Sequence, residues 1–175
     1  MTDPLDVPVR MVADGEPTTL RALIGGQPML VVLTRHLDCP YCEVHVGRVI
    51  RSRDELGRVV LVAHGEVEEL REHYRFLPAE FLLVCDETQD LYDAFATRRL
   101  SKMTELRVRA WNLLTIGVRH MVRGGKISRP GQDLLQLGGD VVVDATGDVA
   151  WIHRSQRADD RVPTTELATR MHRAA

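Results

Sequence analysis

Three short runs of apolar residues occur in the first half of the chain, and each is followed by a segment with helical spacing. These runs are Met29 to Leu33, Val59 to Ala63 and Phe81 to Val84. Short runs without polar alternation are typical of strands buried on both faces, as in a parallel sheet. The pattern therefore predicts three parallel strands with intervening helices. The predicted helices cover Pro40 to Arg53, Glu66 to Arg75 and Asp86 to Ala96.

A different pattern is found nearer the two ends of the chain. Val7 to Val12 alternates apolar and polar residues, which predicts a short strand. Val141 to Val143 and Val149 to Ile152 flank the turn sequence Thr-Gly-Asp, which predicts a β-hairpin. A terminal helix is predicted from Thr164 to Arg173, with Thr164 or Thr165 as its N-cap.

One extra helical segment is predicted before the hairpin, over residues 105–123. This segment contains Trp111 and several apolar residues. It could form a pocket lid or a dimer face, or it could be ordinary core packing. Parallel strands followed by an antiparallel pair are typical of an α/β fold with a mixed central sheet flanked by helices. The length of 175 residues suits one domain over residues 1–175.

The charge balance excludes several classes of protein. The chain has 23 Lys and Arg against 25 Asp and Glu, a net charge of −2, and 44% of its residues are hydrophobic. Disorder is therefore not expected, and neither is nucleic-acid binding, which usually requires a basic face. The apolar runs are far shorter than the roughly 20 residues that cross a bilayer. We expect a soluble cytoplasmic protein that neither enters a membrane nor carries a targeting segment.

The most informative motif is Cys39-Pro40-Tyr41-Cys42, which follows one predicted strand and opens a predicted helix. Pro40 suits a first helical position, because its missing N–H would have no partner there. Asp38 or Cys39 is then the N-cap, where free backbone N–H groups and the helix dipole stabilise a thiolate. We expect Cys39 to be the ionised thiol. Cys42, one turn further on, is expected to be the more buried of the two and close enough for a disulfide.

Other uses of the cysteine pair stay open. A zinc site needs four ligands, and without a second C-x-x-C it would require Cys85 and a histidine. Two inert buried thiols are a further alternative. A c-type haem is excluded, because Glu43 stands where that motif needs a histidine. We expect no metal and no other cofactor.

Several further residues have two interpretations. Cys85 ends a predicted strand and is either a core thiol or a secondary redox partner at the same sheet edge as Cys39. His45 is expected to be solvated, and otherwise could move a proton for a thiol. His153 and Asp160 either cap the last helix or line the site.

Four segments together resemble a known family. They are TTLRALIGGQPMLVVLTRH, CPYC, FLLVCDETQDLYDAF and QLGGDVVVDATGDVAWIHRSQRADDRVP. They resemble the peroxiredoxin-like branch of the thioredoxin fold, the alkyl hydroperoxide reductase/thiol-specific antioxidant superfamily. The resemblance extends over about Val7 to Met171. It is greatest to the divergent subgroup with a C-x-x-C motif and a Gln-x-Gly-Gly before the hairpin, which includes the prostaglandin F synthase-like peroxiredoxins.

The resemblance implies roles for individual residues. Cys39 matches the redox-active cysteine and Cys42 its resolving partner. Arg35 matches an arginine at the end of the strand, where a guanidinium would stabilise the thiolate and bind a peroxide or carboxylate oxygen. The alternative for Arg35 is a surface ion pair. Substrate-binding positions are expected at His36, Gln136 and Gly138.

The chain departs from the family pattern at three places. His36 stands where typical peroxiredoxins have a threonine, three residues before the redox-active cysteine. The proline that comes earlier in their motif has no counterpart here. Leu137-Gly138-Gly139 precedes the hairpin, where thioredoxins have a cis-proline.

Three functions follow as hypotheses. The first is peroxide reduction through a Cys39 thiolate and sulfenic acid and a Cys39–Cys42 disulfide, which a thioredoxin-like protein or a small thiol then reduces. The second is a thiol–disulfide reductase or isomerase without a peroxide step. The third is a repurposed scaffold that binds or converts a specialised small molecule. The resemblance also implies a possible homodimer.

Overall fold

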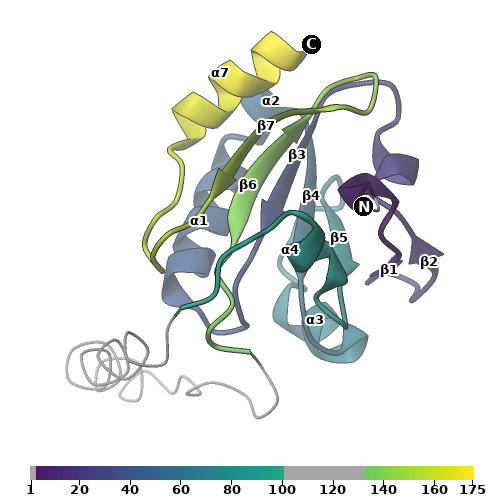
Figure 1. Ribbon diagram of the computed structural model, residues 1–175, viewed down its shortest axis with the longest axis vertical. Helices are drawn as coiled ribbons and strands as arrows, with labels where there is room; N and C mark the ends of the chain where they lie inside the picture. Colours follow the sequence, from purple (N-terminus) through teal and green to yellow (C-terminus); the bar gives the residue numbers. More distant parts are fainter. Residues whose placement is uncertain (1–2, 101–132) are drawn as a thin grey trace.

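The computed structural model describes residues 3–100 and 133–175, which form one seven-stranded sheet with helices around it (Figure 1). The strand order is β2-β1-β5-β4-β3-β6-β7. The strands are β1 (Val9–Met11), β2 (Pro17–Thr18), β3 (Met29–Leu33), β4 (Arg58–Ala63), β5 (Leu82–Cys85), β6 (Gly139–Val143) and β7 (Val149–Arg154). The helices are α1 (Pro40–Arg51), α2 (Arg53–Leu56), α3 (Val67–His73), α4 (Asp90–Ala94) and α7 (Thr164–Ala174), with 3-10 turns η1 (Pro4–Asp6) and η2 (Arg21–Leu23).

The pairing of the strands confirms the predicted mixed sheet. β3, β4 and β5 are parallel neighbours. β6 pairs antiparallel with β3 and with β7, and the hairpin that joins β6 to β7 is the predicted one. β1 adds to the other edge, antiparallel to β5. The predicted helix over residues 105–123 lies outside the described residues.

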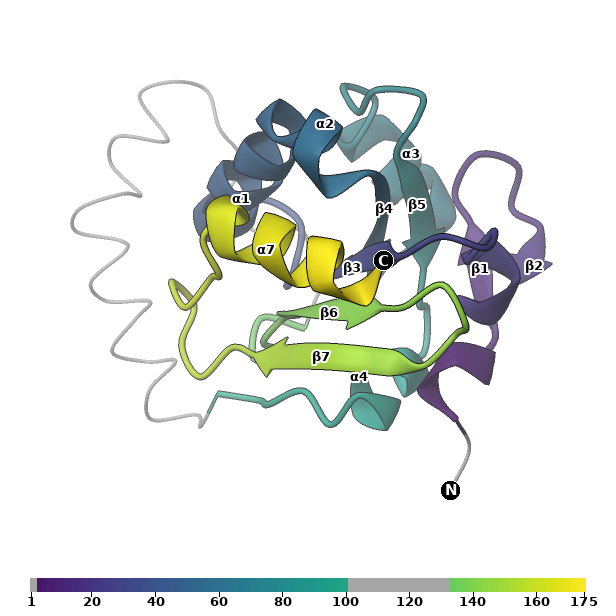
Figure 2. The same cartoon turned by 90° about the horizontal axis from the view of Figure 1, so that it is seen from above.

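The sheet separates two hydrophobic cores. On β3, Met29, Val31 and Leu33 belong to the core that includes residues of α4, whereas Leu30 and Val32 belong to the core that includes residues of α1, α2 and α7. This alternation follows from the two-residue period of a strand, and it explains why the run contains no polar residue. Figure 2 shows α1 and α7 on one side of β6 and α4 on the other.

Two helix starts differ from the sequence-based expectation. The helix expected from Asp86 begins only at Asp90, because the Asp86 carboxylate accepts hydrogen bonds from the backbone N–H groups of Leu91 and Tyr92. The prediction of Thr164 or Thr165 as N-cap of the last helix was wrong. Pro163 is the N-cap of α7, and the Thr164 hydroxyl accepts a hydrogen bond from the Ser52 hydroxyl instead.

The topology collects polar side chains at one edge of the sheet. β3 and β4 are parallel, so both end at the lower edge in Figure 1, and β6 begins there with Gly139 opposite Leu33. The segments that follow β3 and β4 and precede β6 therefore meet at this edge, where α1 also starts. Within the described part of the chain, no helix is long and apolar enough to span a membrane.

Candidate functional site

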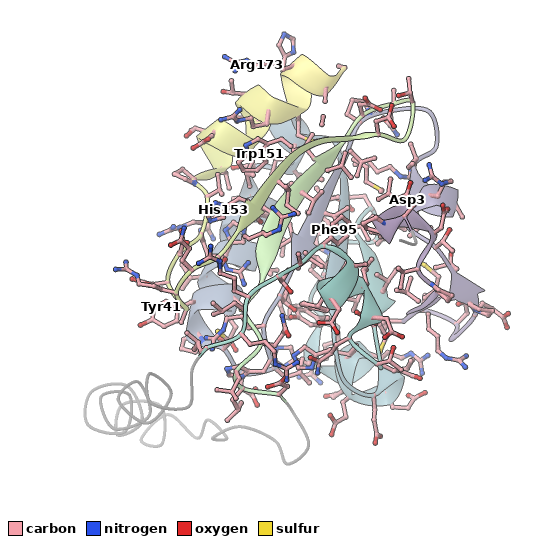
Figure 3. The ribbon with its side chains drawn as sticks, in the orientation of Figure 1. Asp3, Tyr41, Phe95, Trp151, His153 and Arg173 are labelled. Carbon is pink, nitrogen blue, oxygen red and sulfur yellow. The ribbon has the colours of Figure 1, made fainter. Side chains whose placement is uncertain are left out.

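The two cysteines of the motif lie where α1 begins, at the polar edge of the sheet. Cys39 is the N-cap of α1 and Pro40 is its first residue, as predicted. Cys42 lies one turn further on, and both cysteines are free thiols. Figure 3 shows Tyr41, which lies between them in the motif, at the left-hand margin of the molecule. Both thiols are buried, Cys39 at 1% and Cys42 at 3% exposed, so their exposed fractions do not rank one above the other.

Arg35 lies beneath the cysteine pair and is not part of a surface ion pair. Its side chain is buried, and its Nε and Nη2 donate to the carbonyl oxygens of Gln136 and Leu134 at 3.2 and 3.0 Å. Its Nη1 donates to Cys39 Sγ at 3.4 Å, and its backbone N–H donates to Cys42 Sγ at 3.3 Å. One residue therefore contacts both sulfurs, and the segment before β6 fixes its orientation.

A second guanidinium reaches the pair from the loop before α7. Arg161 Nη2 donates to Cys42 Sγ at 3.2 Å, and its Nη1 donates to the Leu33 carbonyl oxygen at 3.0 Å. Gly138 makes room for this side chain. A Cβ at position 138 would overlap the Leu33 carbonyl oxygen and would lie 2.7 Å from Arg161 Nη2.

These contacts shift the pKa values of the two thiols in opposite directions. The hydrogen bond to Cys42, together with burial, raises the pKa of the Cys39 thiol, although the charge of Arg35 opposes this. Burial opposes ionisation of Cys42, but the Cys39 thiol, the Arg161 charge and the Arg35 backbone N–H hold its pKa well below the ordinary value. The two thiols titrate as a coupled pair, and each sulfur accepts from one guanidinium and one backbone N–H. The expectation of a Cys39 thiolate therefore stays a prediction.

A buried acid–base pair lies behind Arg161. His45 Nε2 is 2.8 Å from Asp140 Oδ1, and the two side chains are 2% and 0% exposed. The prediction that His45 is solvated was therefore wrong, since the residue is on the face of α1 that packs against β6. Burial would raise the pKa of Asp140, but the hydrogen bond from His45 and the charges of His45, Arg161 and His153 lower it. His153, on the neighbouring strand β7, pairs with Asp160 instead, and its Nε2 is 3.1 Å from the Asp160 carboxylate.

The three predicted substrate-binding residues lie around this edge in different ways. His36 is half-buried, its Nδ1 lies 2.7 Å from the Leu37 carbonyl oxygen, and burial lowers its pKa. The Gln136 side chain is buried and donates to the Thr97 hydroxyl and the Leu137 carbonyl, while its backbone carbonyl receives Arg35. Gly138 faces Arg161. Contact of these three residues with a substrate stays a prediction. In the structure, Gln136 contacts Arg35 and Gly138 leaves room for Arg161, so both residues help to position the two arginines.

Cys85 lies apart from the pair, two strands away from β3. It is buried at the end of β5, and its thiol donates to the Gly65 carbonyl oxygen at 3.0 Å. Burial, with the carboxylates of Glu87 and Asp86, raises its pKa to about 12. These surroundings favour the interpretation as a core thiol over that as a redox partner.

The described residues contain one group with the ligand types and spacing for a metal ion. It consists of Asp38, Glu43 and His73, whose ligand atoms lie within 4.8 Å of one another. None of the three cysteines belongs to it, so the zinc alternative built on the cysteines has no support in the described part of the chain. Clusters of partly exposed acidic groups are common on proteins that bind no metal, and the group is equally well explained by the ion pair of His73 with Asp38.

Arg161 and Asp140 were not among the residues predicted for the site. Both lie in the C-terminal segment that resembles the family, but Arg161 is 119 residues from Cys42, and local sequence reasoning does not join the two. The paired glycines at 138 and 139 indicate close approach of another group without naming it.

The model of a family described as AhpC/TSA antioxidant enzyme matches residues 53–157, more than half of the chain. The chain belongs to the AhpC/TSA antioxidant enzyme family. The matched residues of this AhpC/TSA protein include Gln136, Gly138 and Asp140 but begin after the cysteine motif. A search of the curated proteins found no significant match.

Solved structures show which fold the AhpC/TSA protein has. It is similar to the bacterioferritin comigratory protein of Xanthomonas campestris (18% identity, TM-score 0.64, covering 98% of this chain and 94% of that one). It is also similar to peroxidoxin BcpB of Mycobacterium tuberculosis (13%, 0.63, 95% and 92%) and to DsbF of the same organism (17%, 0.60, 100% and 99%). The fold is therefore thioredoxin-like, as the sequence resemblance implied, and the family is one of thiol-based oxidoreductases.

Proposed function

We propose that this AhpC/TSA protein reduces peroxides through its Cys39–Cys42 pair. The observation that carries the proposal is the buried pair of thiols between the guanidinium groups of Arg35 and Arg161. Two cations beside two sulfurs favour the thiolate, which is the form of cysteine that attacks an O–O bond. The family membership and the alkyl peroxide reduction named for the similar Xanthomonas campestris protein support the same activity.

The proposed reaction takes two electrons from the cysteine pair. The Cys39 sulfur attacks the peroxide and takes one oxygen as a sulfenic acid, and the other oxygen leaves as an alcohol or water after it gains a proton. The Cys42 sulfur then attacks the Cys39 sulfur, the S–S bond forms, and the S–OH oxygen leaves as water. The sum is one peroxide and two thiols giving one disulfide, one alcohol and one water.

The other components of the cycle are part of the proposal. Arg35 is placed to hold a peroxide oxygen near Cys39, because a guanidinium presents several N–H donors in one plane. A thioredoxin-like protein or a low-molecular-weight thiol returns two electrons to the disulfide by thiol–disulfide exchange. We expect this cycle to operate in the cytoplasm, in a monomer or a homodimer.

The direct test is mass spectrometry after addition of one equivalent of hydrogen peroxide. The expected result is a loss of two mass units with a Cys39–Cys42 bridge in the peptide map. Cys85→Ser should form the same bridge, whereas Cys42→Ser should stop at a sulfenic acid that dimedone traps on Cys39. A wild-type protein that stays reduced, or that consumes peroxide no faster than free cysteine, would contradict the proposal.

A second function is favoured by the hydrogen bond of the Thr34 hydroxyl, at the end of the strand that precedes the cysteine pair. Thr34 is buried and its hydroxyl donates to the Val62 carbonyl oxygen at 3.0 Å, so it is not directed at the cysteines. His36 stands where typical peroxiredoxins have the threonine, and DsbF, with the same fold, is known in mixed oxidised and reduced forms. A thiol–disulfide reductase needs no such hydroxyl. Stopped-flow measurement separates the two, since the reductase should reduce a model disulfide rapidly and leave peroxide untouched.

A further inference from the structure

We propose that Thr97 is a positioning residue for the cysteine pair, because its hydroxyl fixes the segment that orients Arg35 on Cys39. The proposal rests on the proposed function, since it takes the Cys39 sulfur as the group that attacks the peroxide. Thr97 follows α4, and among the described hydrogen bonds none joins it to either sulfur. It acts through Gln136 and Arg35.

The orientation of the Arg35 guanidinium depends on two backbone carbonyl groups. Its Nε donates to the Gln136 carbonyl oxygen at 3.2 Å and its Nη2 to the Leu134 carbonyl oxygen at 3.0 Å. The third nitrogen, Nη1, donates to Cys39 Sγ at 3.4 Å. Because a guanidinium is planar, the two anchored nitrogens fix the direction of the third. The position of residues 134–136 therefore decides whether Arg35 reaches the sulfur.

The side chain of Gln136 holds this segment in place. It is fully buried, and its Nε2 donates to the Thr97 hydroxyl oxygen at 2.7 Å and to the Leu137 carbonyl oxygen at 2.9 Å. These two bonds use both N–H groups of the amide. Its Oε1 is buried and has no hydrogen-bond partner among the described residues. Turning the amide over would place Oε1 against the Leu137 carbonyl oxygen, so the orientation observed requires an acceptor at Thr97.

The Thr97 hydroxyl is a fixed acceptor. It donates its own proton to the Tyr92 carbonyl oxygen at 2.9 Å, which leaves the lone pairs of its oxygen for Gln136. The backbone N–H of Thr97 donates to the same carbonyl oxygen at 3.0 Å, so the residue is tied to α4 by two bonds. A continuous line of hydrogen bonds therefore runs from α4 through Thr97, Gln136 and Arg35 to Cys39.

Backbone hydrogen bonds also join the segment after α4 to the segment before β6. They run from the Leu100 N–H to the Leu135 carbonyl and from the Leu137 N–H to the Arg98 carbonyl, at 2.8 and 2.9 Å. These bonds do not involve the Thr97 hydroxyl, so we expect the two segments to stay paired when that hydroxyl is removed.

The loss of the hydroxyl should act on the guanidinium instead. A buried amide N–H without an acceptor is costly, so the Gln136 side chain must turn or shift, and its backbone carbonyl with it. The contact of Arg35 with Cys39 then weakens. Because the charge of Arg35 lowers the pKa of both thiols, the pair should ionise at a higher pH and react more slowly.

The test compares Thr97→Val, which has nearly the same shape without the hydroxyl, with the wild type. Peroxide consumption by the reduced protein in a single turnover should slow by about tenfold. The pH midpoint for alkylation of the pair by iodoacetamide, measured in a Cys85→Ser background, should rise by about half to one pH unit. A purely structural role would lower the melting temperature and leave this midpoint where it is.

A conservative variant and a matched control accompany Thr97→Val. Thr97→Ser keeps the hydroxyl and should restore both the rate and the midpoint. Arg99→Gln breaks the ion pair with Asp133, which joins the same two segments at a residue 52% exposed, and it should change neither quantity. Wild-type rate and midpoint in a folded Thr97→Val protein, or a defect that Thr97→Ser shares, would overturn the proposal.

Gln136→Met tests the same line of hydrogen bonds from its other end. It removes the amide and keeps the backbone carbonyl, so it should reproduce the defect of Thr97→Val, and it decides the question if Thr97→Val does not fold. The double variant should be no worse than the more affected single variant, because both changes break one line. Additive defects would show that the two residues act separately and would overturn the proposal.

The outcome is separable from that of the proposed function. A wild-type protein that leaves peroxide untouched, with the midpoint raised in Thr97→Val and restored in Thr97→Ser, would reject the peroxidase and keep the positioning role. Rapid peroxide consumption by the wild type and by both Thr97→Val and Gln136→Met would reject the positioning role alone.

Discussion

Cys42 and Cys85 are equally buried thiols that the protein places in opposite electrostatic settings. Cys42 lies in the first turn of α1 and Cys85 at the end of β5, and the two side chains are 3% and 1% exposed. Cys42 receives N–H groups from Arg35 and Arg161. Cys85 only donates its proton to the Gly65 carbonyl, and carboxylates lie nearby. Burial and nearby carboxylates raise the pKa of the Cys85 thiol, whereas fixed N–H groups and cations hold the pKa of the buried Cys42 thiol low.

The largest expected effect contrasts the two cysteines directly. Cys42→Ser should lower turnover with peroxide and a thiol reductant by at least about a thousandfold, because removal of one member of a catalytic unit disables the whole unit. Cys85→Ser should keep wild-type turnover, since its thiol stays protonated and makes no contact with the pair. Steady-state kinetics measure both. Equal losses in the two variants would break the comparison.

The next effect concerns the buried pair of His45 and Asp140, which lies near Cys42 and has no counterpart beside Cys85 among the described residues. Asp140→Ala removes one partner of a fully buried pair and leaves His45 without its acceptor. We expect the free energy of unfolding to fall by about 3 kcal/mol, as for other broken buried pairs. Urea denaturation measures it. The matched control is Asp160→Ala, whose partner His153 is 27% exposed and whose loss should cost less than about 1 kcal/mol.

A smaller effect is expected where the backbone approaches Arg161. In Gly138→Ala the new methyl group meets the Leu33 carbonyl oxygen and the guanidinium. The strand or the arginine must shift, and we expect a loss of about 2 kcal/mol in stability together with a higher Cys42 pKa. Gly47→Ala in α1 is the control, since a Cβ there meets only Arg51 at 3.5 Å. That variant should gain a few tenths to about 1 kcal/mol from helix propensity.

The last effect is absent at neutral pH and tests His64, a neighbour of the same edge that is uncharged there. Burial lowers the pKa of His64 to about 4. Below about pH 6.5 the unfolded chain therefore binds a proton at this histidine, and the folded chain does not. The free energy of unfolding then falls as the pH drops from 6.5 towards 4, by up to about 1.4 kcal/mol per pH unit. His64→Gln should flatten this slope in thermal or urea unfolding. His172→Gln, at an exposed position, should keep the slope, and an unchanged slope in both would contradict the assignment.

Much of the fold follows from local patterns. The run from Met29 to Leu33 predicts its strand to the residue, because a strand buried on both faces tolerates no polar side chain. Cys39-Pro40 predicts the start of α1, since proline lacks an N–H at the one place where none is needed. The start of α4 escaped prediction because Asp86 satisfies two backbone N–H groups from outside the helix, and an aspartate can either begin a helix or cap it.

Only those residues of the site that lie close together in the sequence were predictable. Arg35 lies four residues from Cys39, and both follow one strand, so their meeting was expected. Arg161 reaches Cys42 across 119 residues, through a loop whose path depends on the packing of α7 on the sheet. His45 looked solvated in the sequence because a polar residue on a helix usually faces water. Its burial depends on Asp140, one polar residue in an otherwise apolar strand, and no local rule joins the two.

Arg161 donates one hydrogen bond to the Cys42 sulfur and another to the carbonyl oxygen of Leu33, the last residue of β3. When the pair is oxidised, the Cys42 sulfur loses its charge. Its hydrogen bond with Arg161 then weakens, while the hydrogen bond from Arg161 to the Leu33 carbonyl oxygen stays. The guanidinium therefore stabilises the reduced pair more than the disulfide. By the thermodynamic cycle this raises the reduction potential of the pair, which makes the protein a stronger oxidant. The same cycle implies that removal of the arginine lowers the melting temperature of the reduced form more than that of the oxidised form.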